Sequence, residues 1–418
     1  MSRCVVVGSG AREHALAWAL AKSVEVVVTP GNPGIAAHGI RCVTTPATEL
    51  ESDLFVIGPE QPLVEGLADQ LRAQGKVVVG PGADGARLEG SKAYMKEFLA
   101  SARVPTASFG VFDEVGSALA FLATMVPPYV IKTDGLAGGK GVLVTDDFAE
   151  ACDDVRDKLS GSSFGAAGRT IVIEEGLDGP ECSLTVLCDG RSVSALAPAQ
   201  DFKRVGDGDD GANTGGMGAY APMNSMTSDQ VHDVMRSIVA PTMDELTRRG
   251  IDFRGVLYAG VMLTSKGPKL LEYNVRFGDP ETEVLVALYG ERLFELLLQT
   301  ATKSLNDIAV HVDGAAVTVV LASHGYPQSS RGDDVIEGLG ADGQLAAPVE
   351  GVTIFHAGTK LNESRRFATA GGRVLAVTGV GGSLAEARRR AYEGAALVTF
   401  EGRVMRHDIA RDALGGET

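Results

Sequence analysis

Polar residues alternate with apolar ones in one short stretch near the middle of the chain, LLEYNVRFGDPETE. As an extended strand, this stretch places Glu272, Asn274 and Arg276 on one face. The other face carries Leu271, Tyr273, Val275 and Phe277. Solvent is the simplest explanation of a polar strand face. However, an acid and an amide two residues apart also suit Mg²⁺, which takes few protein oxygens beside phosphate and water. The guanidinium would then meet a transferred group, so the rest of the chain has to decide between solvent and metal.

A glycine-rich turn, KTDGLAGGKGV, has a lysine at each end. Apolar runs flank it, so we expect an antiparallel hairpin whose turn carries Lys132 and Lys140. It is not a Walker A loop, because Asp134 replaces the first glycine and Gly141 follows the lysine in place of Ser or Thr. Such a turn can lie over a polyphosphate and donate backbone N–H groups, with the lysines as point charges. We therefore predict phosphate binding, against the alternative of a merely flexible hairpin.

A long segment with little apolar periodicity, PAQDFKRVGDGDDGANTGGMGAY, spans residues 198–220. Structureless loops of this length are uncommon in compact domains and are usually functional or disordered. Glycines crowded beside Asn213 and Thr214 suit a close backbone approach to a ligand. Asp201, Lys203 and Arg204 add charge at the other end. The segment is interpreted as a substrate loop, with disorder as the alternative.

The link EEGLDGPE joins two apolar runs, 170–174 and 182–188. Taken alone, it is best explained as an ordinary hairpin with surface acids. The alternative is that its main chain meets an adenine edge while Glu181 accepts hydrogen bonds from ribose hydroxyls.

The first strand runs into VVVGSGAREH, a Gly-x-Gly turn before a helix. A dinucleotide fingerprint requires a third glycine where Glu13 stands, so an NAD site is disfavoured. A glycine turn at a helix N-terminus can still hold a phosphate, and Arg12 adds charge. A tight turn without any ligand is the alternative.

Composition excludes several function classes for these 418 residues. A net charge of −16 disfavours a nucleic-acid or anionic-membrane partner, because phosphate backbones require clustered Lys and Arg. The five cysteines are scattered without CxxC spacing, which indicates a reduced, cytoplasmic chain. No secretory signal or membrane-length apolar run is recognised. The seven histidines are dispersed, so a histidine metal site is not expected.

Three types of pattern follow one another along the chain. Alternating strands and helices, with one helix expected over 63–73, predict a doubly wound parallel α/β unit ending near Arg103. Strand pairs with glycine-rich links then predict an α+β body with antiparallel hairpins. The last part has further strands and a helix over 383–397, where Ser383 and Glu386 form a capping-box pattern. We expect domains at 1–103, 104–304 and 305–418, the last being β-rich.

In this order, these elements resemble the ATP-grasp carboxylate–amine ligases, and more closely the phosphoribosylamine–glycine ligase (glycinamide ribonucleotide synthetase) family. The resemblance covers nearly the whole length and includes the motifs LEGSKAYMKEFL and GGRVLAVT, while its most specific motifs are NTGGMG and RFGDPET. It implies a pre-ATP-grasp domain, an ATP-grasp body with a mobile lid at about 120–185 and a C-terminal domain. It also implies purine biosynthesis: ATP phosphorylates glycine, and phosphoribosylamine attacks the glycyl phosphate to give glycinamide ribonucleotide, ADP and phosphate.

The resemblance also implies roles for individual residues. Lys132, Lys140 and Arg276 would be catalytic, and Mg²⁺ or Mn²⁺ would lie on Glu272 and Asn274. The expected ATP-binding residues are Lys92, Lys132, Gly138, Gly139, Lys140, Glu174, Glu175, Leu177 and Glu181. The expected substrate-binding residues are Gly10, Arg12, Glu13, Glu60, Asp201, Lys203, Asn213, Thr214, Gly215, Gly216, Met217, Arg276, Asp279 and Glu281. We expect a monomer acting on small molecules, with a dimer as the alternative.

One departure from the wider ATP-grasp pattern concerns the metal. The strand GVLYAGVMLT, before the Glu-x-Asn strand, carries no acid, and Gly260 stands where a second metal-binding carboxylate is expected. This leaves the number of metal ions open. Three other functions compete with the ligase: a sister carboxylate–amine ligase, a catalytically silent ATP-binding regulatory module and an NAD oxidoreductase.

Overall fold

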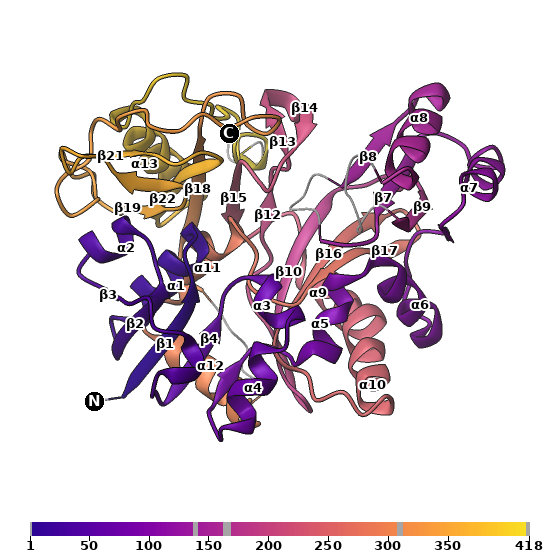
Figure 1. The fold of residues 1–418 in the computed structure, drawn as a ribbon, viewed down its shortest axis with the longest axis horizontal. Helices are drawn as coiled ribbons and strands as arrows, with labels where there is room; N and C mark the ends of the chain where they lie inside the picture. The colour runs from indigo at the N-terminus through magenta and orange to yellow at the C-terminus, as the bar shows by residue number, and fades with distance from the viewer. Residues whose placement is uncertain (1, 137–140, 162–168, 307–311, 415–418) are drawn as a thin grey trace.

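The N-terminal part of the chain forms the parallel, doubly wound sheet that the sequence predicts. The computed structural model describes residues 2–136, 141–161, 169–306 and 312–414. Its first sheet has the order β3-β2-β1-β4-β5, with every neighbouring pair parallel (Figure 1). The strands are β1 (Arg3–Gly8), β2 (Glu25–Pro30), β3 (Arg41–Cys42), β4 (Leu54–Ile57) and β5 (Val78–Val79). Helices cover both faces, because Val5 packs in one apolar cluster with Leu63 and Val6 in another with Leu16.

The helices of this part are short. They are α1 (Ala11–Leu20), α2 (Pro33–Ala37), α3 (Glu60–Val64), α4 (Leu67–Ala73), α5 (Ala83–Gly90) and α6 (Lys92–Ala102). The expectation of one helix over 63–73 is wrong. Gly66 has φ +82, a left-handed conformation that ends α3 and begins α4. At the start of α6 the Ser91 side chain accepts from the Tyr94 N–H, which caps that helix.

A separate four-stranded sheet lies at the upper right of Figure 1. Its order is β6-β9-β7-β8, and all three pairings are antiparallel. The elements are β6 (Phe109–Phe112), α7 (Val115–Leu122), β7 (Tyr129–Thr133), β8 (Val142–Thr145), α8 (Phe148–Leu159) and β9 (Ile171–Glu175). The predicted hairpin around KTDGLAGGKGV is thus confirmed as β7–β8. This sheet and its two helices have their own apolar cluster around Ile131 and Val155.

The central sheet has the order β11-β10-β16-β17 and is antiparallel throughout. Its strands are β10 (Glu181–Asp189), β11 (Val193–Ala195), β16 (Arg254–Thr264) and β17 (Gly267–Asn274), with α9 (Ser228–Val234) and α10 (Ala240–Arg248) nearby. The predicted hairpin over 170–188 is therefore wrong, because β9 belongs to the previous sheet and β10 to this one. The link EEGLDGPE therefore connects two sheets.

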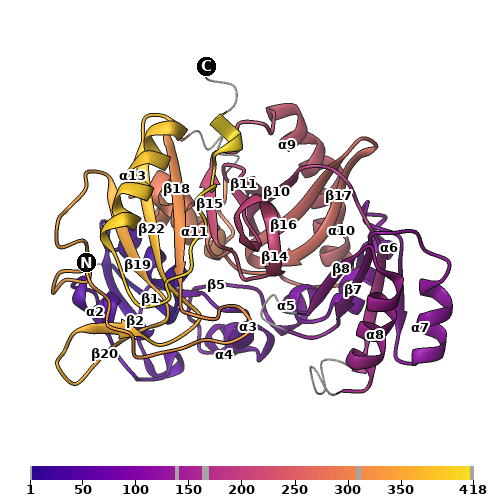
Figure 2. The ribbon, with the colours of Figure 1, turned by 90° about the horizontal axis from the view of Figure 1, so that it is seen from above.

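The fourth sheet has the order β12-β15-β18-β22-β19. Its strands are β12 (Gln200–Asp201), β15 (Gly218–Ala221), β18 (Ala315–Ala322), β19 (Val352–His356) and β22 (Arg373–Gly381). The segment 198–220 is therefore not a structureless loop, since β12 and β15 extend this C-terminal sheet. Between them β13 (Arg204–Gly206) and β14 (Asp210–Asn213) form a two-stranded hairpin, as β20 (Thr359–Leu361) and β21 (Phe367–Thr369) do further on. Figure 2 shows β15, β18 and β22 side by side, with α13 (Leu384–Leu397) next to them.

The helix α13 begins as its sequence predicts. The Ser383 side chain accepts from the Glu386 N–H, while the Glu386 carboxylate accepts from the Gly382 N–H, one residue earlier than in the predicted capping box. The remaining helices, α11 (Glu281–Tyr289) and α12 (Arg292–Thr302), connect the central sheet to β18. Within the described ranges, no helix is both long enough and apolar enough to cross a membrane.

The N-terminal and C-terminal parts meet through three histidines. The His356 N–H donates to His14 Nδ1 at 2.9 Å, which leaves His14 Nε2 to donate to His38 Nδ1 at 3.1 Å. His356 Nε2 donates to the Gly343 carbonyl at 2.8 Å. Burial lowers the pKa of His356 to about 4. The pKa of His14 also falls well below its ordinary value, first through burial and then through the two neighbouring imidazoles. The contact is therefore made of neutral rings in fixed tautomers.

Candidate active site

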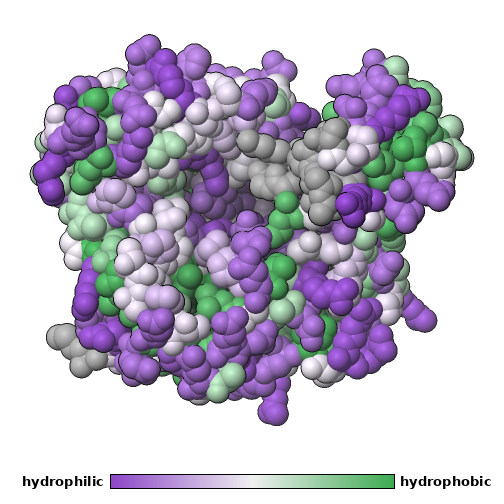
Figure 3. All heavy atoms as spheres, viewed as in Figure 1, coloured by the Kyte–Doolittle hydropathy of each residue, from purple (hydrophilic) through white to green (hydrophobic). Residues whose placement is uncertain are grey.

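A cavity of about 760 Å³ lies where the four sheets approach one another. On the face in Figure 3 the surface is hollowed between the C-terminal part and the β7–β8 part, and the residues seen within are hydrophilic. Most of the predicted site residues line it: Arg12, Glu60, Lys92, Lys132, Glu174, Glu175, Leu177, Glu181, Asp201, Lys203, Asn213, Thr214, Gly215, Glu272, Asn274, Arg276, Asp279 and Glu281. Gly10, Glu13, Gly216 and Met217 are not among the lining residues. Gly138, Gly139 and Lys140 lie outside the described residues.

On one side of the cavity, a buried carboxylate joins two lysines. Glu174 on β9 forms an ion pair with Lys132 on β7 at 3.0 Å and another with Lys96 on α6 at 2.9 Å. Lys132 also donates to the Leu271 carbonyl at 3.3 Å. Burial would raise the pKa of Glu174, but the two lysines outweigh it and lower that pKa. The triad fixes the Lys132 ammonium at the cavity wall. Lys96 was not predicted, although it lies in the quoted motif LEGSKAYMKEFL.

The Glu-x-Asn pair projects from β17 into the same cavity. Residues Glu272 and Asn274 line it, and Gly260 lies directly opposite Glu272 on β16. The Glu272 carboxylate has neither a hydrogen bond nor an ion pair to another described residue, while its main chain pairs with Gly260. Burial would raise the pKa of Glu272, but Lys203, Lys92 and Lys132 together lower it. An ionised carboxylate open to the cavity beside an amide oxygen is a donor set that fits Mg²⁺ completed by phosphate and water.

Two predictions about this strand are wrong, the first because of a β-bulge. Gly260 pairs with Glu272 and Val261 with Leu270, so Leu271 is an extra residue in β17. Leu271 therefore lines the cavity, and Leu270 takes the core position that alternation assigns to Leu271. The strand also ends at Asn274, so Arg276 lies in the following turn.

In the described part of the chain, no cluster of three or more His, Cys, Asp or Glu side chains is arranged to hold a metal ion.

Arg276 is held between two acids of the N-terminal part. Its guanidinium lies 2.8 Å from Glu89 and 3.2 Å from Glu60, and it donates to the Asn274 amide oxygen at 3.2 Å. Burial opposes the charge, but Glu89 and Glu60 outweigh it and raise the pKa of Arg276. The cation is thus permanent and fixed in direction. Glu89 was not predicted. Its signal is an acid in the quoted motif LEGSKAYMKEFL.

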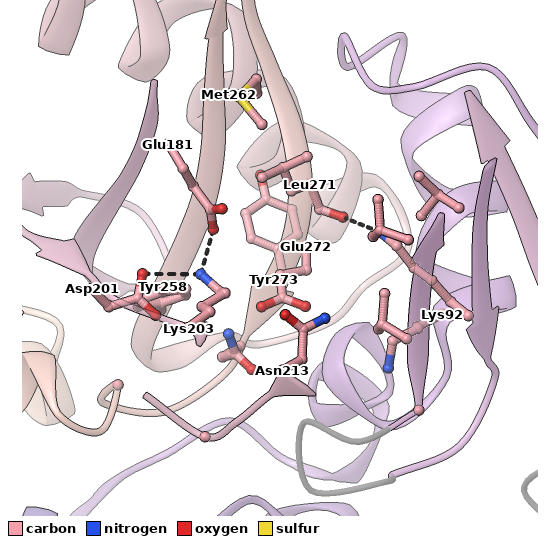
Figure 4. A pocket seen from close by; sticks show the side chains of 18 of the residues that line it. Lys92, Glu181, Asp201, Lys203, Asn213, Tyr258, Met262, Leu271, Glu272 and Tyr273 are labelled. Carbon is pink, nitrogen blue, oxygen red and sulfur yellow. Dashed lines mark hydrogen bonds and ion pairs between the residues drawn. The ribbon is translucent and has the colours of Figure 1, made fainter. Parts of the chain in front are cut away.

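A second cluster of ion pairs includes residues of segment 198–220. Lys203 is ion-paired with Glu181 and, at 3.0 Å, with Asp201 (Figure 4). Figure 4 also shows Glu272 of β17 near this cluster and Lys92 across the cavity. Burial raises the pKa of Asp201 to about 6 although Lys203 opposes this. For Lys203 the two acids outweigh burial and raise its pKa well above the ordinary value. Two neighbouring carboxylates thus share one ammonium.

The C-terminal sheet contributes an arginine that the sequence did not single out. Arg373 donates to the carbonyls of Gly215 at 2.5 Å and Asp279 at 2.8 Å, and its guanidinium lies 3.2 Å from the Asp279 carboxylate. It therefore ties the NTGGMG segment to the turn after β17. Gly216 packs there with φ +109, and an added Cβ would lie 2.5 Å from Pro280. The signal for Arg373 was the quoted motif GGRVLAVT.

The first glycine turn is filled from within. The Glu13 carboxylate accepts from the Gly10 N–H at 2.6 Å and pairs with Arg12 at 2.5 Å. It lies so close to Gly8 and Gly58 that a Cβ at either would clash with it. Arg12 also donates to the Phe277 carbonyl at 3.3 Å and faces the cavity. Glu13 thus caps α1, while Arg12 is the member of this turn that reaches the site.

This arrangement defines an ATP-dependent ligase of the ATP-grasp class: two antiparallel sheets enclose a cavity, one bearing Lys132 and the other Glu272, Asn274 and the adjoining Arg276. The biotin carboxylase domain of 2-oxoglutarate carboxylase from Hydrogenobacter thermophilus has the same fold. That structure superposes with a TM-score of 0.70 at 15% identity, covering 97% of this chain and 91% of that one, which shows likeness of fold alone.

The family follows from the sequence matches. The chain matches the Phosphoribosylglycinamide synthetase N domain over residues 2–89, the ATP-grasp (A) domain over 90–282 and the C domain over 316–412. The chain belongs to the phosphoribosylglycinamide synthetase family. It is 46% identical to a phosphoribosylamine–glycine ligase from Streptomyces coelicolor, with 99% of this chain and 100% of the relative covered. A crystal structure of phosphoribosylamine–glycine ligase from Thermotoga maritima has a TM-score of 0.86 at 38% identity, covering 98% and 100%.

Proposed function

We propose that this chain uses ATP to join glycine to 5-phosphoribosylamine, giving glycinamide ribonucleotide, ADP and phosphate. The observation that carries the proposal is that most of the predicted site residues share one cavity of about 760 Å³. It brings the phosphate-side lysine Lys132 within one space with Glu272, Arg276 and the substrate segment around Thr214. The names of full-length relatives with 43% and 46% identity support the choice of substrates. The proposed setting is de novo purine biosynthesis in the cytoplasm, with the chain acting as a monomer on small molecules.

The proposed nucleotide side comprises the wall of the cavity between the two antiparallel sheets. Lys92 and Lys132 meet the phosphates of ATP, and the same role is assigned to Gly138, Gly139 and Lys140, which lie outside the described residues. The main chain of Glu175 and Leu177, in the link between the sheets, meets adenine, and Glu181 meets ribose. Glu174 acts from behind this wall, because its carboxylate is 2% exposed and holds both Lys96 and Lys132.

Glu272 and Asn274 would hold the Mg²⁺ or Mn²⁺ ion. A bound ion there would neutralise charge on the nucleotide phosphates. The residues present suit such an ion, because the Glu272 carboxylate lines the cavity and is ionised. The position opposite Glu272 on the neighbouring strand is Gly260, which has no side chain. With a single protein carboxylate, phosphate and water oxygens complete the shell, as Mg²⁺ prefers.

The chemical steps need positioning and a fixed positive charge. A glycine carboxylate oxygen attacks the γ-phosphorus of ATP, and ADP leaves. The amine nitrogen of phosphoribosylamine then attacks the carbonyl carbon, the carbon–oxygen bond to phosphate breaks, and the nitrogen loses a proton. Arg276, held by Glu60 and Glu89, stabilises the transferred group and the acyl phosphate. Because water would hydrolyse the acyl phosphate, the site has to exclude it.

The remaining predicted residues are assigned to the substrate side. Asp201, Lys203 and the 213–217 segment surround glycine and the amine, together with Asp279 and Glu281. Gly10, Arg12, Glu13 and Glu60 lie on the phosphoribosyl side, with Arg12 and Glu60 as the members that line the cavity. Glu13 contributes through the shape of the turn, since its carboxylate is 2% exposed.

The test is a product assay with purified protein, Mg²⁺ and ATP. Phosphate release should require both glycine and freshly formed phosphoribosylamine, and mass spectrometry should detect glycinamide ribonucleotide in equal amount to ADP. Alanine in place of glycine, and ribose 5-phosphate without ammonia, are the controls. Ligation of another acid or amine, with none of this pair, would assign the chain to a sister ligase. Nucleotide binding without turnover would favour a regulatory module.

A further inference from the structure

The hairpin β13–β14 forms part of the cavity wall without belonging to any of the larger sheets. Its two strands pair only with each other, from Arg204 to Asn213, with a register shift between them. Arg204, Asp209 and Asn213 line the cavity. At its base the Thr214 N–H and hydroxyl both donate to the Lys203 carbonyl at 2.8 Å. The hairpin therefore lies within the proposed substrate segment. Contacts at its tip help to set its position over the cavity.

Those contacts come from the end of the chain. The Gly208 N–H donates to the Asp408 carboxylate at 2.7 Å, and the His407 N–H donates to the Asp207 carboxylate at 2.7 Å. The Arg406 guanidinium lies 2.6 Å from the Asp209 carboxylate and donates to the Arg204 carbonyl at 3.2 Å. Segment 406–408 thus contacts strand β13 and the turn between the two strands.

Arg406 is built into this contact. Its side chain is 0% exposed, and it binds the buried Asp408 carboxylate with two parallel bonds of 2.8 and 2.7 Å. Its guanidinium also lies over the Phe202 ring, 4.9 Å from the ring centre. A buried guanidinium is tolerated only where its hydrogen bonds are satisfied. Here the satisfying groups lie in Asp408 and the hairpin, so breaking the contact with the hairpin would leave the buried guanidinium only partly hydrogen-bonded.

We propose that Arg406 is a positioning residue that holds the hairpin β13–β14 over the substrate side of the cavity and so keeps water from the acyl phosphate. This rests on the proposed function. When the hairpin is loose, water attacks the carbonyl carbon of glycyl phosphate, the carbon–oxygen bond to phosphate breaks, and glycine and phosphate leave with loss of a proton to solvent. ATP is then consumed without ligation. Residues more than a hundred positions away from the ATP-grasp motifs thereby set the coupling of the reaction.

The experiment compares Arg406→Ala with Arg403→Ala, which removes the same charge three residues earlier. Arg403 donates to the carbonyls of Ala395 and Val398 at the end of α13, away from the hairpin. ADP and glycinamide ribonucleotide are measured in the same reaction. Arg406→Ala should raise the ratio of ADP to product several-fold and the KM for glycine about 10-fold, with the KM for ATP within about twofold. Arg403→Ala should leave the ratio at one.

A second variant keeps the proposal testable if Arg406→Ala does not fold. Asp209 is 67% exposed, so Asp209→Asn weakens the grip from the hairpin side with little effect on folding. It should raise the ADP ratio in the same direction by a smaller factor. If both variants, or Asp209→Asn alone when the other is insoluble, ligate with a ratio of one, the proposal is overturned. If the wild type makes no glycinamide ribonucleotide, it is the proposed function that fails.

Discussion

The two sides of the cavity are built differently. On the proposed nucleotide side, Lys132 is fixed by Glu174, which Lys96 holds in turn, and all three belong to neighbouring elements of the second sheet and α6. On the proposed substrate side, Arg276 is fixed by acids of the N-terminal part, and the turn after β17 by Arg373 of the C-terminal sheet. The nucleotide side is thus assembled locally, whereas the substrate side exists only when three distant parts of the chain are packed together. Substitutions on the two sides should therefore fail in different ways.

The sharpest contrast should come from Arg276→Ala. It removes a fixed cation from the transferred group and leaves the Glu89 carboxylate, which is mostly buried, without this partner. Turnover should fall on the order of 10² to 10³-fold, as for a single oxyanion donor, while the Kd for ATP analogues stays within a few-fold. Steady-state kinetics and nucleotide titration measure both. Arg276→Lys, which keeps the charge but loses the fork, is the control, and unchanged turnover in the Ala variant would remove Arg276 from this role.

The metal should depend on Glu272 more than on any other acid. Glu272→Gln keeps the shape of the side chain but removes the ionised oxygen, so the Mg²⁺ concentration for half-maximal rate should rise about 10- to 100-fold. A titration of rate against free Mg²⁺ measures this. Glu181→Gln, on β10 of the same sheet, is the matched control and should shift the Mg²⁺ requirement far less. Equal shifts in both variants would place the ion between them instead of on β17.

Lys96→Met tests whether the nucleotide side is locally assembled. Lys96 is fully buried, so losing its ion pair weakens the hold on Glu174 and, through it, on Lys132. The KM for ATP should rise about 10-fold, and the KM for glycine should stay unchanged. Arg248→Ala, on the surface of α10, is the control for general destabilisation. A rise in the glycine KM as large as that for ATP would contradict the separation of the two sides.

The smallest effect should be a pH dependence of the N-terminal to C-terminal contact. The pKa of His356 is lowered from 6.5 to about 4, so between these values the unfolded chain binds a proton that the folded chain does not. Stability is therefore complete above pH 6.5 and is lost as pH falls toward 4, by on the order of 3 kcal/mol for this group. Urea unfolding at several pH values measures the slope. His356→Gln should flatten it and His232→Gln, on the exposed face of α9, should not; equal slopes in all three proteins would contradict this origin.

Prediction from sequence succeeded where a local pattern fixes the answer. Alternation placed Glu272 and Asn274 on one strand face, and the glycine-rich turn between Lys132 and Lys140 predicted the β7–β8 hairpin. It failed where partners lie far along the chain. The bulge at Leu271 depends on the pairing of β17 with β16, and the link EEGLDGPE looks like a hairpin because nothing local shows that its strands join different sheets.

The roles of arginines were the least visible in the sequence. Arg373 and Arg406 lie in the C-terminal part. We predicted this part to be β-rich and assigned no site residues to it. Their partners are the carbonyls of Gly215 and Asp279 and the carboxylate of Asp209, all more than ninety residues away. An arginine gives no periodic signal of its own, and its meaning depends on which backbone groups the fold brings to it. Such residues require the structure to be recognised.

Oxygen transfer tests the central claim most directly. Glycine labelled with ¹⁸O in both carboxylate oxygens is turned over with ATP, Mg²⁺ and phosphoribosylamine, and the released phosphate is analysed by mass. If the carboxylate is phosphorylated and the amine then breaks the carbon–oxygen bond, each phosphate should carry one ¹⁸O and each product one. Glycinamide ribonucleotide formed together with unlabelled phosphate would contradict the acyl phosphate and, with it, the account of the cavity given above.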